Sequence, residues 1–195
     1  MTAPVTDTVI RQTLTRQESA PPEGRRHVIL VDATAAMRGD RSVFARAYAL
    51  ALAKKHALSG DEVAIRFFDA QLYEPIDAGD RLPVAEVIGF RGEDGRNVAR
   101  VLRRLADEIE ATQRRRPRRV IVHFVTHGAT QAPRDLVTRI LHSAELSVVL
   151  VSPGGTADAG FVDLVTSCRI VTSADTADPA RQASRARELL LEHPP

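Results

Sequence analysis

The stretch His27-Val-Ile-Leu-Val-Asp-Ala-Thr-Ala-Ala-Met37 decides the fold of this chain. A continuous run of apolar, strand-forming residues ends at Asp32, and small residues follow it with a hydroxyl at Thr34. Such a run is typical of a strand that is buried on both faces of a parallel sheet. We therefore expect Asp32 and Thr34 at the carboxyl end of a buried strand, where open α/β sheets bind their ligands.

The composition fits one globular domain preceded by an arm. The chain has 195 residues, 44% of them hydrophobic, which is enough for one sizeable core. Residues 1–26 are rich in Thr, Gln, Arg and Pro and predict a weakly ordered arm, so the folded domain is expected over residues 27–195. His123, mid-strand among apolar residues, is expected to be a packed histidine rather than a ligand, and Cys168 a buried, inert thiol.

Strands and helices alternate along the expected domain. Apolar runs predict strands at residues 27–32, 62–68, 119–126, 146–152 and 169–172. Helical spacing predicts helices at residues 41–58, 83–88, 98 to about 116, 133–143, 159–165 and 179–192. Only a tight turn separates the second strand from residues 72–76, which should pair back as an antiparallel edge strand. The alternation predicts an α/β fold with a doubly wound, mostly parallel six-stranded sheet and helices on both faces.

Four short segments follow one another on these elements. They are Asp32-Ala-Thr-Ala-Ala-Met-Arg-Gly39, Gly60-Asp-Glu-Val63 with its strand to Phe68-Asp69, Gly95-Arg-Asn-Val98 and Thr126-His-Gly128. In this order they resemble the von Willebrand factor A (vWA) domain superfamily, in particular its bacterial intracellular members. The resemblance runs from about His27 to the end of the chain. It implies the Rossmann-like fold predicted above and three loops that surround a divalent cation, the family's metal-ion-dependent adhesion site.

The residues that would bind this cation are only partly kept. Asp32 and Thr34 match the family's Asp-x-Ser-x-Ser segment, whereas Ala36 lacks the second hydroxyl. Arg96 stands where the family has a threonine, and His127 stands where it has an aspartate. Mg²⁺ requires near-octahedral oxygen coordination, which a permanently charged guanidinium and an imidazole nitrogen do not supply. We therefore expect a degenerate site with no bound metal and no cofactor, in which Asp32 and Thr34 are residual metal positions.

Two arrangements of Arg96 remain open. Its guanidinium could take the place of the cation and form a bidentate ion pair with Asp32. Alternatively, Arg96 could point to solvent while backbone amides of its own loop satisfy the Asp32 carboxylate.

The expected function is that of a non-catalytic scaffold or adaptor that binds other proteins. The partner-binding surface would be the loop end that carries Asp32, Thr34, Arg96 and His127. The resemblance to bacterial intracellular vWA proteins implies a MoxR-type AAA+ ATPase as a partner. The amino-terminal arm and the run Arg114-Arg-Arg-Pro-Arg-Arg119 are second candidate surfaces. The arginine run lacks the interleaved aromatic residues that favour nucleic acid. No signal peptide or membrane segment is evident, so we expect a cytoplasmic protein.

Two other functions are alternatives. A Mg²⁺-dependent vWA ligand-binding domain would keep its ion through Asp32, Thr34 and water molecules. A receiver-like phosphoacceptor domain would use Asp32 as the phosphorylated carboxylate. That reaction needs a neighbouring acidic pair and a lysine at a later strand end, where this chain has Ser152 and Thr172.

Overall fold

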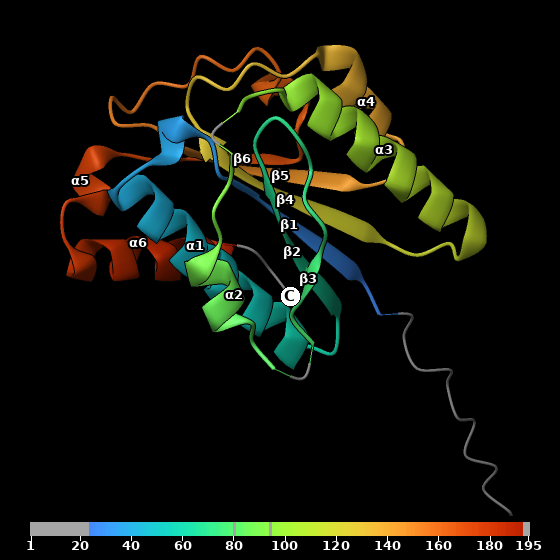
Figure 1. The fold of residues 1–195 in the computed structure, drawn as a ribbon, viewed down its shortest axis with the longest axis horizontal. Helices are drawn as coiled ribbons and strands as arrows, with labels where there is room; N and C mark the ends of the chain where they lie inside the picture. Colours follow the sequence, from blue (N-terminus) through green and yellow to red (C-terminus); the bar gives the residue numbers. More distant parts are fainter. Residues whose placement is uncertain (1–23, 80, 94, 193–195) are drawn as a thin grey trace, which may run out of the picture.

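The computed structural model describes residues 24–79, 81–93 and 95–192 (Figure 1). Most of the arm predicted at residues 1–26 therefore lies outside the described residues. Arg26 already belongs to the first strand, one residue earlier than predicted. None of the described helices is both long and apolar enough to cross a membrane.

The six strands form one mixed sheet, as predicted. Its order is β3-β2-β1-β4-β5-β6, and the strands are β1 (Arg26–Asp32), β2 (Glu62–Phe68), β3 (Ile76–Asp77), β4 (Val120–His127), β5 (Glu145–Val151) and β6 (Ser167–Val171). All neighbours pair in parallel except β3, which is antiparallel to β2. β1 has a parallel neighbour on either side and is buried on both faces, which explains its unbroken apolar run.

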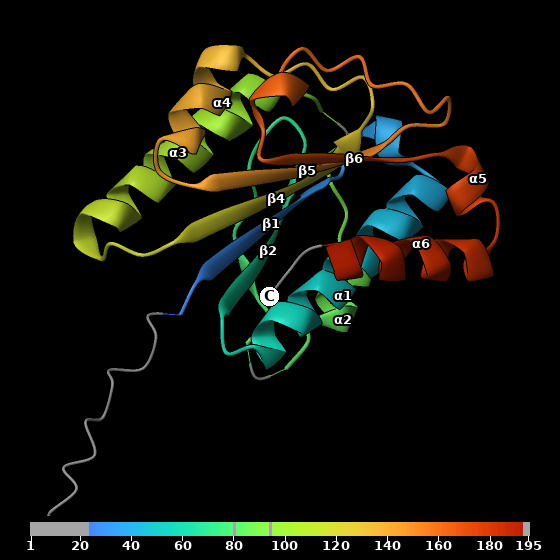
Figure 2. The ribbon, with the colours of Figure 1, turned by 180° about the vertical axis from the view of Figure 1, so that it is seen from behind.

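Helices cover both faces of this sheet, in two layers that Figures 1 and 2 show from opposite sides. One layer contains α3 (Val98–Arg115) and α4 (Arg134–Leu141). The other contains α1 (Asp40–Leu58), α2 (Val84–Gly89), α5 (Ser173–Thr176) and α6 (Pro179–Glu192). Alternate side chains of β1 enter the two cores: Val28 and Leu30 pack in the cluster that contains α3, while Ile29 and Val31 pack against α1.

Three local predictions were wrong in detail. The edge strand is short and starts at Ile76, because Pro75 has no N–H for the ladder; an isolated bridge joins Phe68 to Leu72. The helix predicted at 159–165 is only a 3-10 turn, η2 (Val162–Leu164). Cys168 is half-buried rather than buried, since β6 is an edge strand with less cover than the strands at the centre.

The sheet order creates a switch point between β1 and β4. From β1 the chain proceeds outward to β2, and from β4 it proceeds in the opposite direction to β5. The loops that follow β1 and β4 therefore diverge at the carboxyl edge of two adjacent strands. Ligands of doubly wound sheets bind at such a point.

Candidate functional site

Asp32 lies at this switch point and is only 3% exposed. Its Oδ1 accepts a hydrogen bond from the backbone N–H of Thr34 at 2.8 Å. Its Oδ2 accepts one from the Thr126 hydroxyl at the end of β4, at 2.6 Å. The Thr130 hydroxyl lies 2.6 Å from the Thr126 hydroxyl and completes a short chain of hydrogen bonds. Both oxygens of the buried carboxylate thus have donors within the fold.

His127 and Thr34 contribute buried polar atoms beside this carboxylate. His127 Nδ1 accepts from the backbone N–H of Ala129 at 3.3 Å, which leaves the hydrogen of the neutral ring on Nε2. Burial lowers the pKa of His127; Asp32 opposes the shift, while Arg96 and Arg41 add to it. Among the described residues, His127 Nε2 and Thr34 Oγ1 are both buried without a hydrogen-bond partner. Both atoms lie inside the fold beside Asp32, and neither is exposed to solvent.

Arg96 matches neither predicted arrangement in full. Its side chain is exposed, and Nη2 donates to the backbone carbonyl of Ala129 at 3.0 Å. The contact ties the loop before α3 to the loop after β4. Asp32 in turn is satisfied by one amide of its own loop and by a hydroxyl from a neighbouring strand. The structure therefore brings Arg96 to the loop edge, where its guanidinium donates to the Ala129 carbonyl.

Asp69, quoted above only as the end of the second vWA-like segment and not as a site residue, fixes the loop before α3. It is fully buried and accepts hydrogen bonds from the Tyr73 hydroxyl and from the backbone N–H of Glu93, both at 2.7 Å. A Cβ on Gly92 would lie 3.0 Å from Asp69 Oδ2, so this loop needs a glycine to pass so close. Its position directly after β2 was the only sequence signal for this role.

These groups do not form the donor set that Mg²⁺ requires. The single carboxylate has both oxygens engaged by N–H and O–H donors, and the positions of two further family ligands hold Arg96 and His127. A dication here would find one carboxylate that already accepts two hydrogen bonds, with a guanidinium and an imidazole nitrogen at the other two positions.

A pocket of about 340 Å³ adjoins Thr34 and is rich in arginine. Its lining includes Thr34, Arg38, Arg46, Arg91 and Gly92. Arg46 is held in place: it donates to the carbonyl of Ile88 at 2.6 Å, and its guanidinium lies 5.4 Å from the centre of the Phe67 ring. Arg38 and Arg91 are exposed at the rim. Guanidinium groups arranged in this way favour a carboxylate or another anion.

Comparisons with known proteins agree with this architecture. No protein-family model and no curated protein matches the sequence. Among solved structures, the chain is similar to a von Willebrand factor type A protein from Catenulispora acidiphila, with 15% identity and a TM-score of 0.56 over 86% of this chain and 42% of that one. It is similar to the conserved hypothetical protein BatB from Bacteroides thetaiotaomicron, with 13% identity and a TM-score of 0.57 over 87% of this chain and 100% of that one.

The pilus adhesin SpaC from Lactobacillus rhamnosus GG is a third similar structure, with 11% identity and a TM-score of 0.60. That match covers 88% of this chain but 30% of the adhesin. The chain has the vWA fold, and the resemblance stated from its sequence is confirmed at the level of the fold.

Proposed function

We propose that this chain is a non-catalytic protein-interaction module that binds an acidic segment of a partner protein without a metal ion. The binding surface is the loop edge that carries Asp32, Thr34, Arg96 and His127, together with the arginine-lined pocket beside Thr34. That pocket is the observation that carries the proposal, because it offers guanidinium groups next to the position where vWA domains bind a cation.

The charge of this edge suits a carboxylate. Arg91 and Arg96 are exposed on the loop before α3, and Arg38 is exposed on the loop after β1. A glutamate or aspartate side chain in the pocket would receive charge-assisted hydrogen bonds from guanidinium groups. Thr34 also lines this pocket, but its hydroxyl is buried, so the guanidinium groups are the donors that a carboxylate would meet. Permanent positive charges would thus do here what a bound cation does in a metal-dependent domain.

The geometry argues against the phosphoacceptor alternative. An aspartate that accepts a phosphoryl group must present one carboxylate oxygen to the incoming phosphorus. In this chain Asp32 is buried, and both of its oxygens accept hydrogen bonds from within the fold. A protein-binding role needs no such access, since the partner would contact the exposed rim around the carboxylate.

The partner class rests on resemblance alone. A MoxR-type AAA+ ATPase is the partner that similarity to bacterial intracellular vWA proteins implies, and a cytoplasmic location belongs to the same proposal. An acidic loop on the partner would complement the arginine-rich edge.

Charge reversal tests the proposal. Partners would first be captured from a native cell extract and then measured as purified proteins by calorimetry, with and without EDTA. We expect Arg91→Glu and Arg96→Glu each to weaken binding by about tenfold or more, since a reversed charge repels an acidic partner. Arg103→Glu, at an exposed position on α3, is the matched control and should bind as the wild type does. Unchanged affinity in both loop variants would exclude this edge as the interface, and loss of binding in EDTA would favour the Mg²⁺-dependent alternative.

A further inference from the structure

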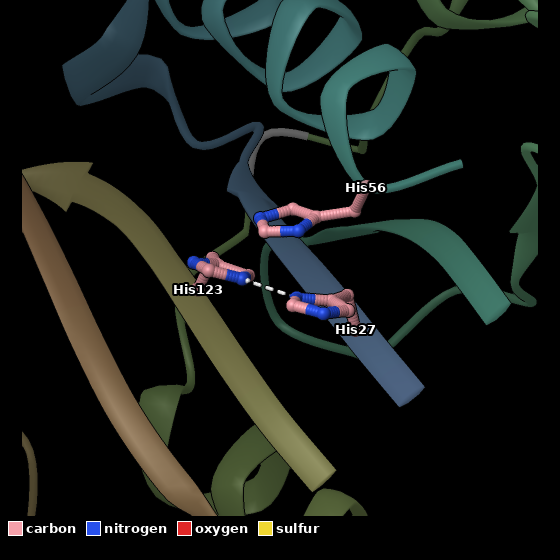
Figure 3. A group of neighbouring side chains, drawn as sticks. All are labelled: His27, His56 and His123. Carbon is pink, nitrogen blue, oxygen red and sulfur yellow. Dashed lines mark hydrogen bonds between the residues drawn. The ribbon is translucent and has the colours of Figure 1, made fainter. Parts of the chain in front are cut away.

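Three histidines meet toward the amino ends of the strands, away from the loop edge. They are His27 on β1, His56 near the end of α1 and His123 on β4 (Figure 3). Their side chains are buried, with exposures of 1%, 2% and 4%. One nitrogen of each ring can be chosen so that all three lie within 4.8 Å of one another. Among the described residues, this is the one cluster of histidine, cysteine and acidic side chains with such spacing.

A carboxylate orients the first histidine. His27 Nε2 lies 3.2 Å from Asp61 Oδ2, and Asp61 is in turn paired with Arg25 at 3.1 Å. An ionised carboxylate only accepts hydrogen bonds, so His27 carries its hydrogen on Nε2 and keeps the lone pair of Nδ1. That lone pair faces His123 Nε2 at 2.9 Å. A carboxylate behind a histidine in this way is the usual support of a metal-binding imidazole.

His56 completes the cluster from the helix side. Its ring stacks on that of His27, with 3.6 Å between the centroids. Neither ring nitrogen has a hydrogen-bond partner among the described residues, and Nδ1 lies 3.8 Å from Asp61 Oδ2. Buried nitrogens without a partner are rare in folded proteins and call for an explanation. A ligand that accepts the lone pair of one nitrogen supplies that explanation.

The cluster adjoins a cavity at the surface of the protein. The three rings line a cavity of about 210 Å³, whose wall also includes Arg119, Glu145 and Ser147. The side chains of Arg119 and Glu145 form an ion pair and are well exposed, so the cavity has a polar mouth. An ion would enter from this cavity once the His56 ring turns toward it, and water would occupy the coordination positions that the protein leaves open.

We propose that His27, His56 and His123 bind one transition-metal ion of the Zn²⁺ class, with water as a further ligand. Three imidazoles suit Zn²⁺, Co²⁺, Ni²⁺ or Cu²⁺ and do not suit Mg²⁺ or Ca²⁺. Tetrahedral Zn²⁺ places its nitrogen ligands about 3.3 Å apart, close to the separation already present between His27 and His123. The His56 ring turns out of its stack to point one nitrogen at the ion. Metal bonds then replace the hydrogen bond between His27 and His123, and the hydrogen on His123 Nε2 moves to Nδ1 of the same ring.

The protonation state of the histidine rings favours metal binding. Burial lowers the pKa of His27 to about 4 and that of His56 to about 3, so both are neutral near pH 7. Neutral imidazole is the form that binds metal, and no proton has to be removed from these rings first. Arg25 balances the charge of Asp61, so the site would bind through nitrogen coordination rather than through excess negative charge.

Titration of the metal-free, untagged chain tests the site. After treatment with EDTA and its removal, Zn²⁺ is added in a calorimeter and Co²⁺ in a visible spectrophotometer. We expect one ion per chain and visible absorption bands with the intensity typical of four-coordinate Co²⁺, bound by three nitrogens and a water molecule. His56→Gln and His123→Gln should each weaken Zn²⁺ binding by at least about tenfold. The exposed His142→Ala is the matched control and should keep the wild-type affinity.

The results of these titrations distinguish the histidine site from a metal site elsewhere in the protein. Circular dichroism of each metal-free variant establishes that it is folded, and the wild-type cobalt spectrum needs no variant at all. A wild-type protein that binds neither ion overturns the proposal. So does equal binding by the wild type and both folded glutamine variants. Loss of binding in His127→Gln instead would place the ion at the loop edge beside Asp32 and would also overturn it.

Discussion

The Thr126 hydroxyl donates to Oδ2 of Asp32 over 2.6 Å and so joins the end of β4 to the end of β1. In the sequence, this aspartate resembles a metal ligand. In the fold, it is the acceptor of a buried hydrogen bond between two central strands, with Thr34 as its second donor. The carboxylate therefore has a structural role that is independent of any ion.

Thr126→Val should destabilise the protein. Valine has nearly the same shape as threonine, so the change removes a donor and leaves Oδ2 of the buried carboxylate without one. We expect a loss of about 1–3 kcal/mol in the free energy of unfolding, measured by urea denaturation at pH 7. Thr126→Ser keeps the hydroxyl and should lose less. Thr138→Val, at an exposed position on α4, should change stability by less than about 0.5 kcal/mol. Equal losses in the two valine variants would contradict the assigned role.

Arg96→Ala should have only a small effect on stability. The guanidinium is exposed and donates to one backbone carbonyl, so we expect a change of less than about 1 kcal/mol in the same assay. A buried ion pair with Asp32 would instead make the loss several times larger, because an unpaired carboxylate would remain in the interior. A loss of about 3 kcal/mol or more in the free energy of unfolding would therefore support a buried ion pair between Arg96 and Asp32.

Mg²⁺ should leave the melting temperature unchanged at millimolar concentrations. An ion that binds the folded state raises its stability with the logarithm of the ion concentration, but the Asp32 oxygens are already engaged. Thermal unfolding with MgCl₂ would be compared with NaCl of equal ionic strength. A rise in melting temperature that appears in the wild type and disappears in Asp32→Asn would show that the site does bind the ion.

Much of the fold could be predicted because buried strands and helices have recognisable patterns of apolar residues in the sequence. The central strands are covered on both faces and read as continuous apolar runs, as in β1 and β5. Short elements have too few residues to show such a pattern clearly. α5 has only four residues and depends on a capping box between Thr172 and Asp175, so its apolar periodicity is too short to detect.

The candidate site could be predicted in place but not in detail. Strand ends bring Asp32, Thr34, Arg96 and His127 to one edge, because the carboxyl ends of parallel strands meet there. Which atoms they contact depends on side-chain rotamers and on residues far along the chain. Arg96, for example, donates to the carbonyl of Ala129, which lies 33 positions further along the chain. The histidine cluster was missed for the same reason, since His27 and His123 are 96 positions apart and meet only through the register of β1 and β4.

Stability should fall as the pH drops below about 6.5. Burial lowers the pKa of His27 from 6.5 to about 4. Between these values the unfolded chain binds a proton that the folded chain does not, so protons favour unfolding. The stabilisation is complete above the unfolded pKa and is lost as the pH falls toward 4. His56, with a pKa lowered to about 3, acts in the same direction.

Urea denaturation with EDTA between pH 6.5 and 5 would measure this dependence, above the range in which most carboxylates titrate. His56→Phe retains an aromatic ring but cannot bind a proton, so its stability should fall less steeply than that of the wild type. His142→Ala, which removes an exposed histidine, is the control variant. Parallel slopes for the wild type and His56→Phe would show that His56 does not resist protonation in the folded state.

Gly128→Ala should destabilise the loop edge regardless of any ligand. A Cβ at this position would lie 2.5 Å from Ser152 Cβ and 2.9 Å from the Thr156 carbonyl oxygen, closer than such atoms approach in proteins. The loop after β4 would have to move away from the loop after β5, and we expect a loss of about 1–3 kcal/mol in urea denaturation. Gly160→Ala is the matched control, because a Cβ there meets nothing within 4 Å. Similar stability of the two variants would mean that the loops separate easily, and the glycine of the Thr-His-Gly segment would then need an explanation other than packing.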